Sequence, residues 1–182
     1  MKFSIIRIIS LLSLVLISVG CKSEVKQGNE AGGTQMSIPV SSPSFKEGER
    51  IPIKFTCDGT NISPQLNWSG QPATIHSLAL IMDDPDAPAG TFVHWVLYNL
   101  PGDMASLPEG VNGTGVAGIN GFRKLGYGGP CPPKGSTHRY FFKLYALDSA
   151  LDLKEGASKA EVERAMQGHI LGQGQLSGKY SR

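Results

Sequence analysis

Short apolar runs separated by turn residues dominate the chain after about residue 35. The runs lie near Ile38 and at residues 51–55, 78–82, 93–100 and 140–147. Glycine (23) and proline (12) together supply 35 of the 182 residues, without an internal repeat. Short strands with frequent turn signals are typical of a β-sandwich, and this length suits one core. We therefore expect one mainly β domain over residues 36–182.

One segment has a helical pattern instead. Ser158 and Glu161 form the sequence signature of a capping box, and apolar residues then recur at helical spacing. We expect a short helix near residues 158–170 that covers one face of a sheet. Gly172 and Gly174 break this pattern, so residues 175–180 are expected to return as a last strand. Residues 101–124 are glycine-rich and weakly patterned, which is typical of a functional or a mobile loop.

The first 35 residues carry no core pattern. Residues 1–20 combine Lys2 and Arg7 with an apolar stretch, which predicts a secretory signal peptide. The segment Ile17-Ser-Val-Gly-Cys21 resembles a bacterial lipobox, so Cys21 is expected to be lipidated and to anchor the protein on the exported side of a membrane. The alternatives are a freely secreted form and an uncleaved anchor. Residues 21–35 are polar and would form a flexible tether.

The charge balance limits the partners. The chain has 17 basic and 15 acidic residues, and removal of the first twenty leaves 15 of each. A neutral domain without a basic stripe does not predict a nucleic-acid partner. Contact with a membrane would therefore come from the lipid on Cys21 rather than from charge.

The segment Tyr127 to Tyr140 predicts a rigid loop, and it leads into an apolar strand over Arg139 to Leu147. Its prolines and glycines cannot continue a helix or a central strand. Strand alternation then places His138 on the same side as Tyr140, Phe142 and Leu144. Imidazole and backbone N–H groups can both donate to an oxyanion, so this loop is a candidate wall of a small anion pocket.

Carboxylates gather where another strand ends. Residues 75–82 read as a buried strand that runs into Asp83, Asp84 and Asp86, which need a cationic or proton-donating neighbour. His94, in the next apolar run, is the candidate neighbour. Period two would place His94 with Phe92, Val96 and Tyr98, opposite Trp95. The Ala87–Pro88 bond is a candidate cis peptide.

Several motifs in order resemble the phosphatidylethanolamine-binding protein family, and most closely its bacterial Raf kinase inhibitor-like branch. They are Asp84-Pro-Asp-Ala-Pro88, His94-Trp95, Gly129-Pro-Cys-Pro-Pro-Lys-Gly135 and His138-Arg-Tyr140, with agreement from about Phe45 onward. The resemblance implies a β-sandwich of that family. It also implies a ligand site made by Asp84, Asp86, His94, Pro132, Pro133, His138 and Tyr140.

Such a site would bind a small anion, either phosphate or a phosphorylethanolamine-like phospholipid headgroup, without catalysis or cofactor. Each imidazole would be oriented through one nitrogen while the other faces the ligand. Asp84 and Asp86 would raise the histidine pKa values. One alternative is inhibition of a protein kinase or protease through the pocket rim. Another is a metal-dependent phosphoesterase, with zinc on the two histidines and two aspartates. Related bacterial proteins also suggest a homodimer.

Two further cysteines remain. In an oxidising compartment Cys57 and Cys131 could pair as a disulfide, since both lie in motifs that border the expected pocket. They could equally be small buried residues. Their spacing in the sequence does not decide between the two.

Overall fold

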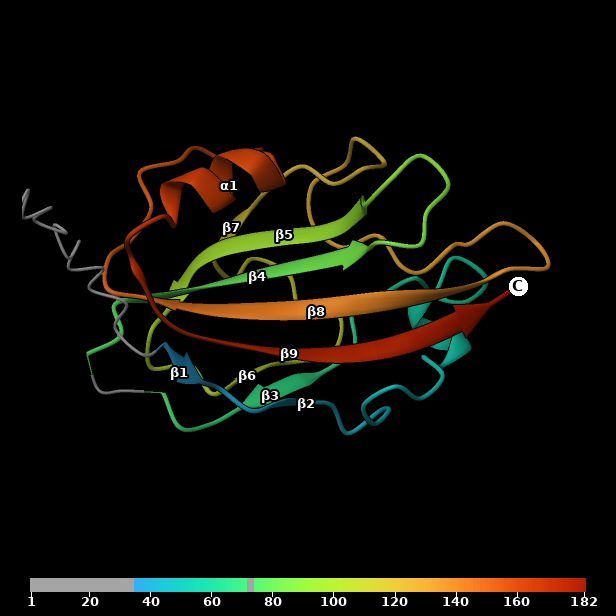
Figure 1. The fold of residues 1–182 in the computed structure, drawn as a ribbon, viewed down its shortest axis with the longest axis horizontal. Helices are drawn as coiled ribbons and strands as arrows, with labels where there is room; N and C mark the ends of the chain where they lie inside the picture. The colour runs from blue at the N-terminus through green and yellow to red at the C-terminus, as the bar shows by residue number, and fades with distance from the viewer. Residues whose placement is uncertain (1–34, 72–73) are drawn as a thin grey trace, which may run out of the picture. The chain divides into compact units, whose positions relative to one another are not determined.

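The computed structural model describes residues 35–71 and 74–182, which form two β-sheets, a short helix and a 3₁₀ turn (Figure 1). The predicted signal peptide, Cys21 and nearly all of the predicted tether lie outside these residues. The large sheet has six strands in the order β1-β9-β8-β4-β5-β7. These strands are β1 (Met36–Ser37), β4 (Ser77–Asp84), β5 (Phe92–Pro101), β7 (Val116–Ala117), β8 (Thr137–Leu147) and β9 (Ile170–Ser181).

The small sheet packs against one face of the large one. Its order is β2-β3-β6, with β2 (Val40–Ser41), β3 (Leu66–Trp68) and β6 (Ser106–Leu107). Helix α1 (Lys159–Ala165) lies on the opposite face of the large sheet, as Figure 1 shows. The mainly β sandwich predicted from the sequence is therefore confirmed, with a helix as a third layer.

Alternation along the central strand β4 divides the apolar side chains between two cores. Leu78, Leu80 and Met82 point into the core between the sheets, whereas Ala79 and Ile81 point toward α1. All five are fully buried. The strand reads as a continuous apolar run because both of its faces are covered.

Three predicted boundaries differ from the structure. Residues Ile53–Phe55 form the 3₁₀ turn η1 rather than a strand. Helix α1 ends at Ala165, earlier than predicted, and β9 begins at Ile170. Gly174 belongs to β9, where a Cβ would lie 1.7 Å from the Ile38 carbonyl oxygen. A side chain at position 174 would clash with the backbone of Ile38, so this position requires glycine. Gly174 therefore lies within the last strand rather than before it.

A buried carboxylate joins α1 to the large sheet. Asp83 Oδ2 accepts hydrogen bonds from Lys143 Nζ at 2.9 Å and from Lys159 Nζ at 2.6 Å. Asp83 is 1% exposed, so its charge requires these partners.

In the part of the chain that the structure describes, no helix is long and apolar enough to cross a membrane.

The capping box of α1 yields a stability prediction. Ser158 Oγ accepts from the Glu161 N–H, and Glu161 Oε2 accepts from the Ser158 N–H. Ser158→Ala should lower the free energy of unfolding by about 1 kcal/mol, measured by urea denaturation. Ser158→Thr retains a hydroxyl that can accept from the Glu161 N–H and donate to Glu161 Oε2, and should remain close to wild type. Equal losses in the two variants would show that the cap does not stabilise α1.

Candidate functional site

The candidate site begins with a side-chain hydrogen bond between the ends of β4 and β8. Because Asp83 pairs with Phe141, the next residue of β4, Asp84, lies beside Tyr140 and near His138. His138 Nδ1 lies 2.7 Å from Asp84 Oδ2, and the two residues are 5% and 3% exposed. The Nδ1–H group donates to the carboxylate, whose other oxygen accepts from the Asp86 N–H at 2.8 Å. Asp84 therefore fixes the orientation of the His138 ring.

His94 enters the same cluster through a β-bulge in β5. Met82 pairs with Trp95 while Asp83 pairs with Val93, so His94 is an extra residue without a partner on β4. A bulge redirects side chains at this point. His94 consequently faces the Tyr140 side of the sheet, with ring centroids 5.1 Å apart. The predicted alternation, with His94 on the side of Val96 and Tyr98, was wrong for this reason.

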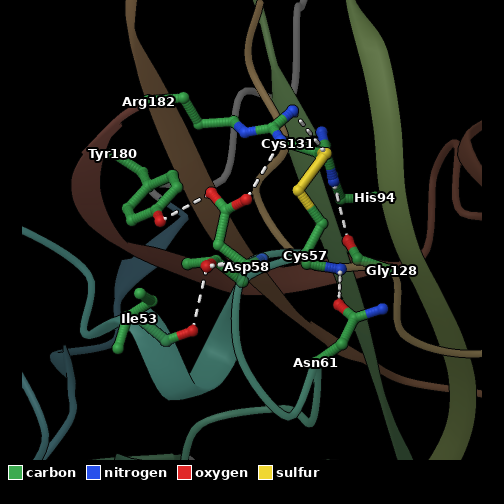
Figure 2. Close-up of a disulfide and its surroundings, with 11 residues drawn as sticks. Ile53, Cys57, Asp58, Asn61, His94, Gly128, Cys131, Tyr180 and Arg182 are labelled. Carbon is green, nitrogen blue, oxygen red and sulfur yellow. Dashed lines mark hydrogen bonds and ion pairs between the residues drawn. A yellow bond between two sulfur atoms is a disulfide. The ribbon is translucent and has the colours of Figure 1, made fainter. Parts of the chain in front are cut away.

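Three aromatic rings surround the His94 imidazole. Besides Tyr140, the rings of Phe92 and Phe122 lie edge-on at 5.0 and 5.5 Å. Nδ1–H donates to the Gly128 carbonyl oxygen at 2.7 Å, as Figure 2 shows. Burial lowers the pKa of His94, and this effect outweighs the hydrogen bond to Gly128 and the charge of Asp84. Asp84 thus raises the pKa of His94 as expected, but burial reverses the net direction, and the neutral ring leaves Nε2 as a hydrogen-bond acceptor.

Tyr140 carries an unsatisfied polar group. Its hydroxyl is buried and makes no hydrogen bond of normal geometry with any described residue, although the Asp84 side chain and the Cys131 backbone lie near enough to shift its pKa. Burial, followed by the charge of Asp84, raises the pKa of Tyr140, so the phenol is protonated at neutral pH. A buried hydroxyl without a partner costs about 1–3 kcal/mol. The site thus contains a donor that the described residues leave unused.

The four residues form a closed cluster rather than an open cup. His94 and His138 are 3% and 5% exposed, and Tyr140 is fully buried. The adjacent surface cavity, of about 290 Å³, begins beyond Phe122 and Gly128, both of which contact His94. Phe122 is 42% exposed and covers the His94 ring from this side. Phe122 and Gly128 therefore lie between the cavity and His94.

A larger groove lies elsewhere among the described residues. It measures about 760 Å³ and is lined by residues 35–40, Glu47 and side chains of β8 and β9. None of the predicted ligand-binding residues contributes to it.

The other predicted site residues lie around the cluster. Asp86 is bound by Arg139, whose Nη2 and Nε donate to its two oxygens at 2.7 and 2.9 Å. Pro132 is buried and Pro133 is exposed, so only Pro132 packs inside the loop. The Ala87–Pro88 bond is trans, since the described residues contain no cis peptide, and that prediction was wrong.

The loop that supplies Gly128 is fastened to the turn around η1. A disulfide joins Cys57 to Cys131, with their Cα atoms 5.4 Å apart (Figure 2). Nearby, Gly129 N–H donates to Asn61 Oδ1 at 2.8 Å, and Tyr127 Oη donates to the Phe55 carbonyl at 2.7 Å. These contacts fix the carbonyl that orients His94.

Sequence reasoning missed Phe122, Gly128 and the two asparagines Asn61 and Asn120. Asn120 shapes the loop that holds Phe122, because its Oδ1 accepts from the Phe122 and Lys124 N–H groups. Asn61 has a left-handed backbone with φ of 61°. Asparagine next to glycine-rich sequence was the available signal, but it indicates a turn without showing what the turn approaches.

Metal coordination finds no support in the geometry. Among residues 35–71 and 74–182, no three His, Cys, Asp or Glu side chains gather closely enough to hold an ion. The zinc arrangement considered for the two histidines and two aspartates is therefore not formed by the described side chains.

Comparisons with known proteins agree with the fold and the motifs. The family model described as phosphatidylethanolamine-binding protein matches residues 41–181. A UPF0098 protein of Methanothermobacter thermautotrophicus is 53% identical over 149 residues, which are 79% of this chain and 98% of the relative. One from Aquifex aeolicus is 50% identical over 161 residues, 84% of this chain and 92% of the relative.

Two solved structures are similar to this chain. A phosphatidylethanolamine-binding protein homologue from Chlamydia trachomatis has a TM-score of 0.77 and 40% identity, covering 80% of this chain and 98% of its own. E. coli YbcL, described as a member of the mammalian family, has a TM-score of 0.74 and 31% identity with the same coverage. The names of these relatives state no reaction.

The contact between Asp86 and Arg139 predicts a pH effect on stability. The hydrogen bond from Arg139 lowers the pKa of Asp86 from 3.8 to about 2. A carboxyl whose pKa is lower in the folded state stabilises above its unfolded pKa and ceases to do so as the pH falls through the folded value. Asp86→Asn should thus destabilise by about 1 kcal/mol at pH 7, and this difference should shrink between pH 3.8 and about 2.

Urea midpoints of both proteins across this pH range measure the effect. Asp152→Asn removes another exposed carboxylate and is the control for the loss of one charge. A difference between wild type and Asp86→Asn that persists unchanged at low pH would contradict the assignment.

Proposed function

Because the chain belongs to the phosphatidylethanolamine-binding protein family, we propose that it binds a small phosphate-bearing anion at the cluster of Asp84, His94, His138 and Tyr140. The ligand would be phosphate itself or the phosphate of a phospholipid headgroup, held without chemical conversion. The predicted lipid on Cys21 would keep the exported domain near such headgroups.

The buried Tyr140 hydroxyl carries this proposal. Its protonated oxygen is a donor without a partner among the described residues, in a part of the protein that water does not freely reach. A ligand oxygen would supply the missing acceptor. Residues that stabilise a fold are normally paired, whereas unpaired polar groups concentrate at functional sites.

His94 adds a requirement on the ligand. Its pKa is lowered by burial and Nδ1–H is occupied by Gly128, so Nε2 of the neutral ring accepts a hydrogen bond. A phosphate monoester that retains one proton can donate to His94 and accept from Tyr140. A fully ionised anion can only accept. The cluster therefore favours a protonated oxyanion.

Asp84 and His138 would complete the site without turning an unpaired carboxylate oxygen toward the ligand. Each oxygen of Asp84 already accepts a hydrogen bond, one from His138 and one from the Asp86 backbone. His138 is held through Nδ1, which leaves Nε2 for a ligand. Entry would require Phe122 to move from its place against His94, and its 42% exposure permits this.

Tyr140→Phe tests the central observation. The variant removes an unpaired buried hydroxyl, so stability should be unchanged or higher, while affinity for phosphoethanolamine should fall about tenfold through the lost hydrogen bond. Calorimetric titration and urea denaturation measure the two effects. Tyr127→Phe is the matched control, because its hydroxyl is bonded to Phe55 and its removal should cost about 1 kcal/mol of stability. Unchanged phosphoethanolamine affinity in Tyr140→Phe would contradict the proposal.

A matched pair of anions tests the role of His94. Phosphoethanolamine should bind at least about tenfold more tightly than ethanolamine O-sulfate at pH 6, because the sulfate has no proton to donate to His94. The affinity of phosphoethanolamine should fall above pH ~6, where a phosphate monoester loses its last proton. The His94 ring signals in NMR titrations report both comparisons. Equal binding of the sulfate would mean that His94 donates instead.

A further inference from the structure

The Cys57–Cys131 disulfide lies near the candidate site and involves an exposed residue, Cys57. The proposed anion binding does not require this disulfide to react. Cys57 is exposed and Cys131 is partly buried. The two residues link segments 74 positions apart, namely the turn after η1 and the loop that supplies Gly128. A nucleophile from solvent would therefore reach Cys57 more easily than Cys131.

The two sulfurs differ in their electrostatic surroundings. Arg182 Nη1 lies 3.5 Å from Cys131 Sγ (Figure 2). The same guanidinium is held by Asp58, whose Oδ1 lies 3.0 Å from Nη2, and Asp58 Oδ2 accepts from Tyr180 Oη at 2.8 Å. A guanidinium beside a sulfur stabilises its thiolate, and a thiol with a lower pKa is the better leaving group in exchange.

We propose that the Cys57–Cys131 bridge is a site of thiol–disulfide exchange with a dithiol reductant, with Cys57 as the attacked sulfur and Cys131 as the leaving thiolate. The thiolate of the reductant forms a bond to Cys57 Sγ as the Cys57–Cys131 bond breaks, and Arg182 stabilises the Cys131 thiolate. The second thiol of the reductant then displaces Cys57. The bridge gains two electrons and becomes two thiols, and the dithiol becomes a disulfide.

Reduction of the disulfide would loosen the loop that supplies Gly128 but would not unfold it. Three hydrogen bonds still tie the loop to the η1 turn after reduction: Cys57 N–H to the Pro130 carbonyl at 3.1 Å, Gly129 to Asn61, and Tyr127 to Phe55. The constraint lost is the covalent one, so the Gly128 carbonyl becomes less firmly placed. Since that carbonyl orients His94, reduction should weaken anion binding. This consequence rests on the proposed function, whereas the exchange chemistry does not.

The rate of reduction by dithiothreitol tests the exchange step in the purified protein. Arg182→Gln should slow reduction at pH 7 by about threefold to tenfold, and Arg182→Lys should restore part of the rate. Lys134→Gln, which removes a positive charge from the same loop, is the control and should react as wild type does. Equal rates for wild type and Arg182→Gln would overturn the proposal.

Single-cysteine variants test the assignment of the two sulfurs. With Cys57→Ser, the pH dependence of Cys131 alkylation by iodoacetamide should give a thiol pKa below ~8.5, and adding Arg182→Gln should raise it. Mass spectrometry of the mixed disulfide trapped with a monothiol should find the adduct on Cys57. An adduct mainly on Cys131 would overturn the direction of attack.

The coupling to the pocket is measured with phosphoethanolamine. Its affinity should be several-fold lower for the reduced protein than for the oxidised one. Equal affinities in the two forms would overturn the coupling. Absence of binding in both forms would instead refute the proposed function, while the rates and alkylation pKa values would still decide whether exchange occurs.

Discussion

The hydrogen bond between the Asp84 carboxylate and the His138 imidazole lets two polar side chains remain buried at the ends of adjacent strands. Neither group could stay there alone, because an unpaired buried charge is costly. Their pairing holds β4 and β8 in a register that brings Tyr140 beside Asp84. Around this pair some polar groups are satisfied, such as His94 Nδ1 on Gly128, whereas the Tyr140 hydroxyl makes no hydrogen bond of normal geometry with a described residue.

Much of this arrangement follows from local patterns in the sequence. The apolar runs predict β4, β5 and β8 because alternation and turn residues act over a few positions. The capping box predicts the start of α1 for the same reason. The association of Asp84, His94, His138 and Tyr140 depends on strand register, and it was reached through the resemblance to a family. Periodicity alone supplied only the shared face of His138 and Tyr140.

The errors in prediction have identifiable physical causes. A bulge in β5 moves His94 to the opposite face, and a bulge is invisible to a rule of strict alternation. Asp86, just after β4, accepts a hydrogen bond from Arg139 of β8. The order of residues along the chain does not reveal this contact. The lowered pKa of His94 follows from burial among aromatic rings, one of which, Phe122, comes from a loop without recognisable pattern.

The central claim is that the unpaired Tyr140 hydroxyl and the His94 imidazole receive one phosphate-bearing anion. A crystal structure of the protein soaked in phosphoethanolamine tests this most directly. The account predicts phosphate density within hydrogen-bonding distance of Tyr140 Oη and His94 Nε2, with Phe122 displaced from the imidazole. Phosphate bound only in the groove lined by residues 35–40, with Tyr140 still unpartnered, would contradict it.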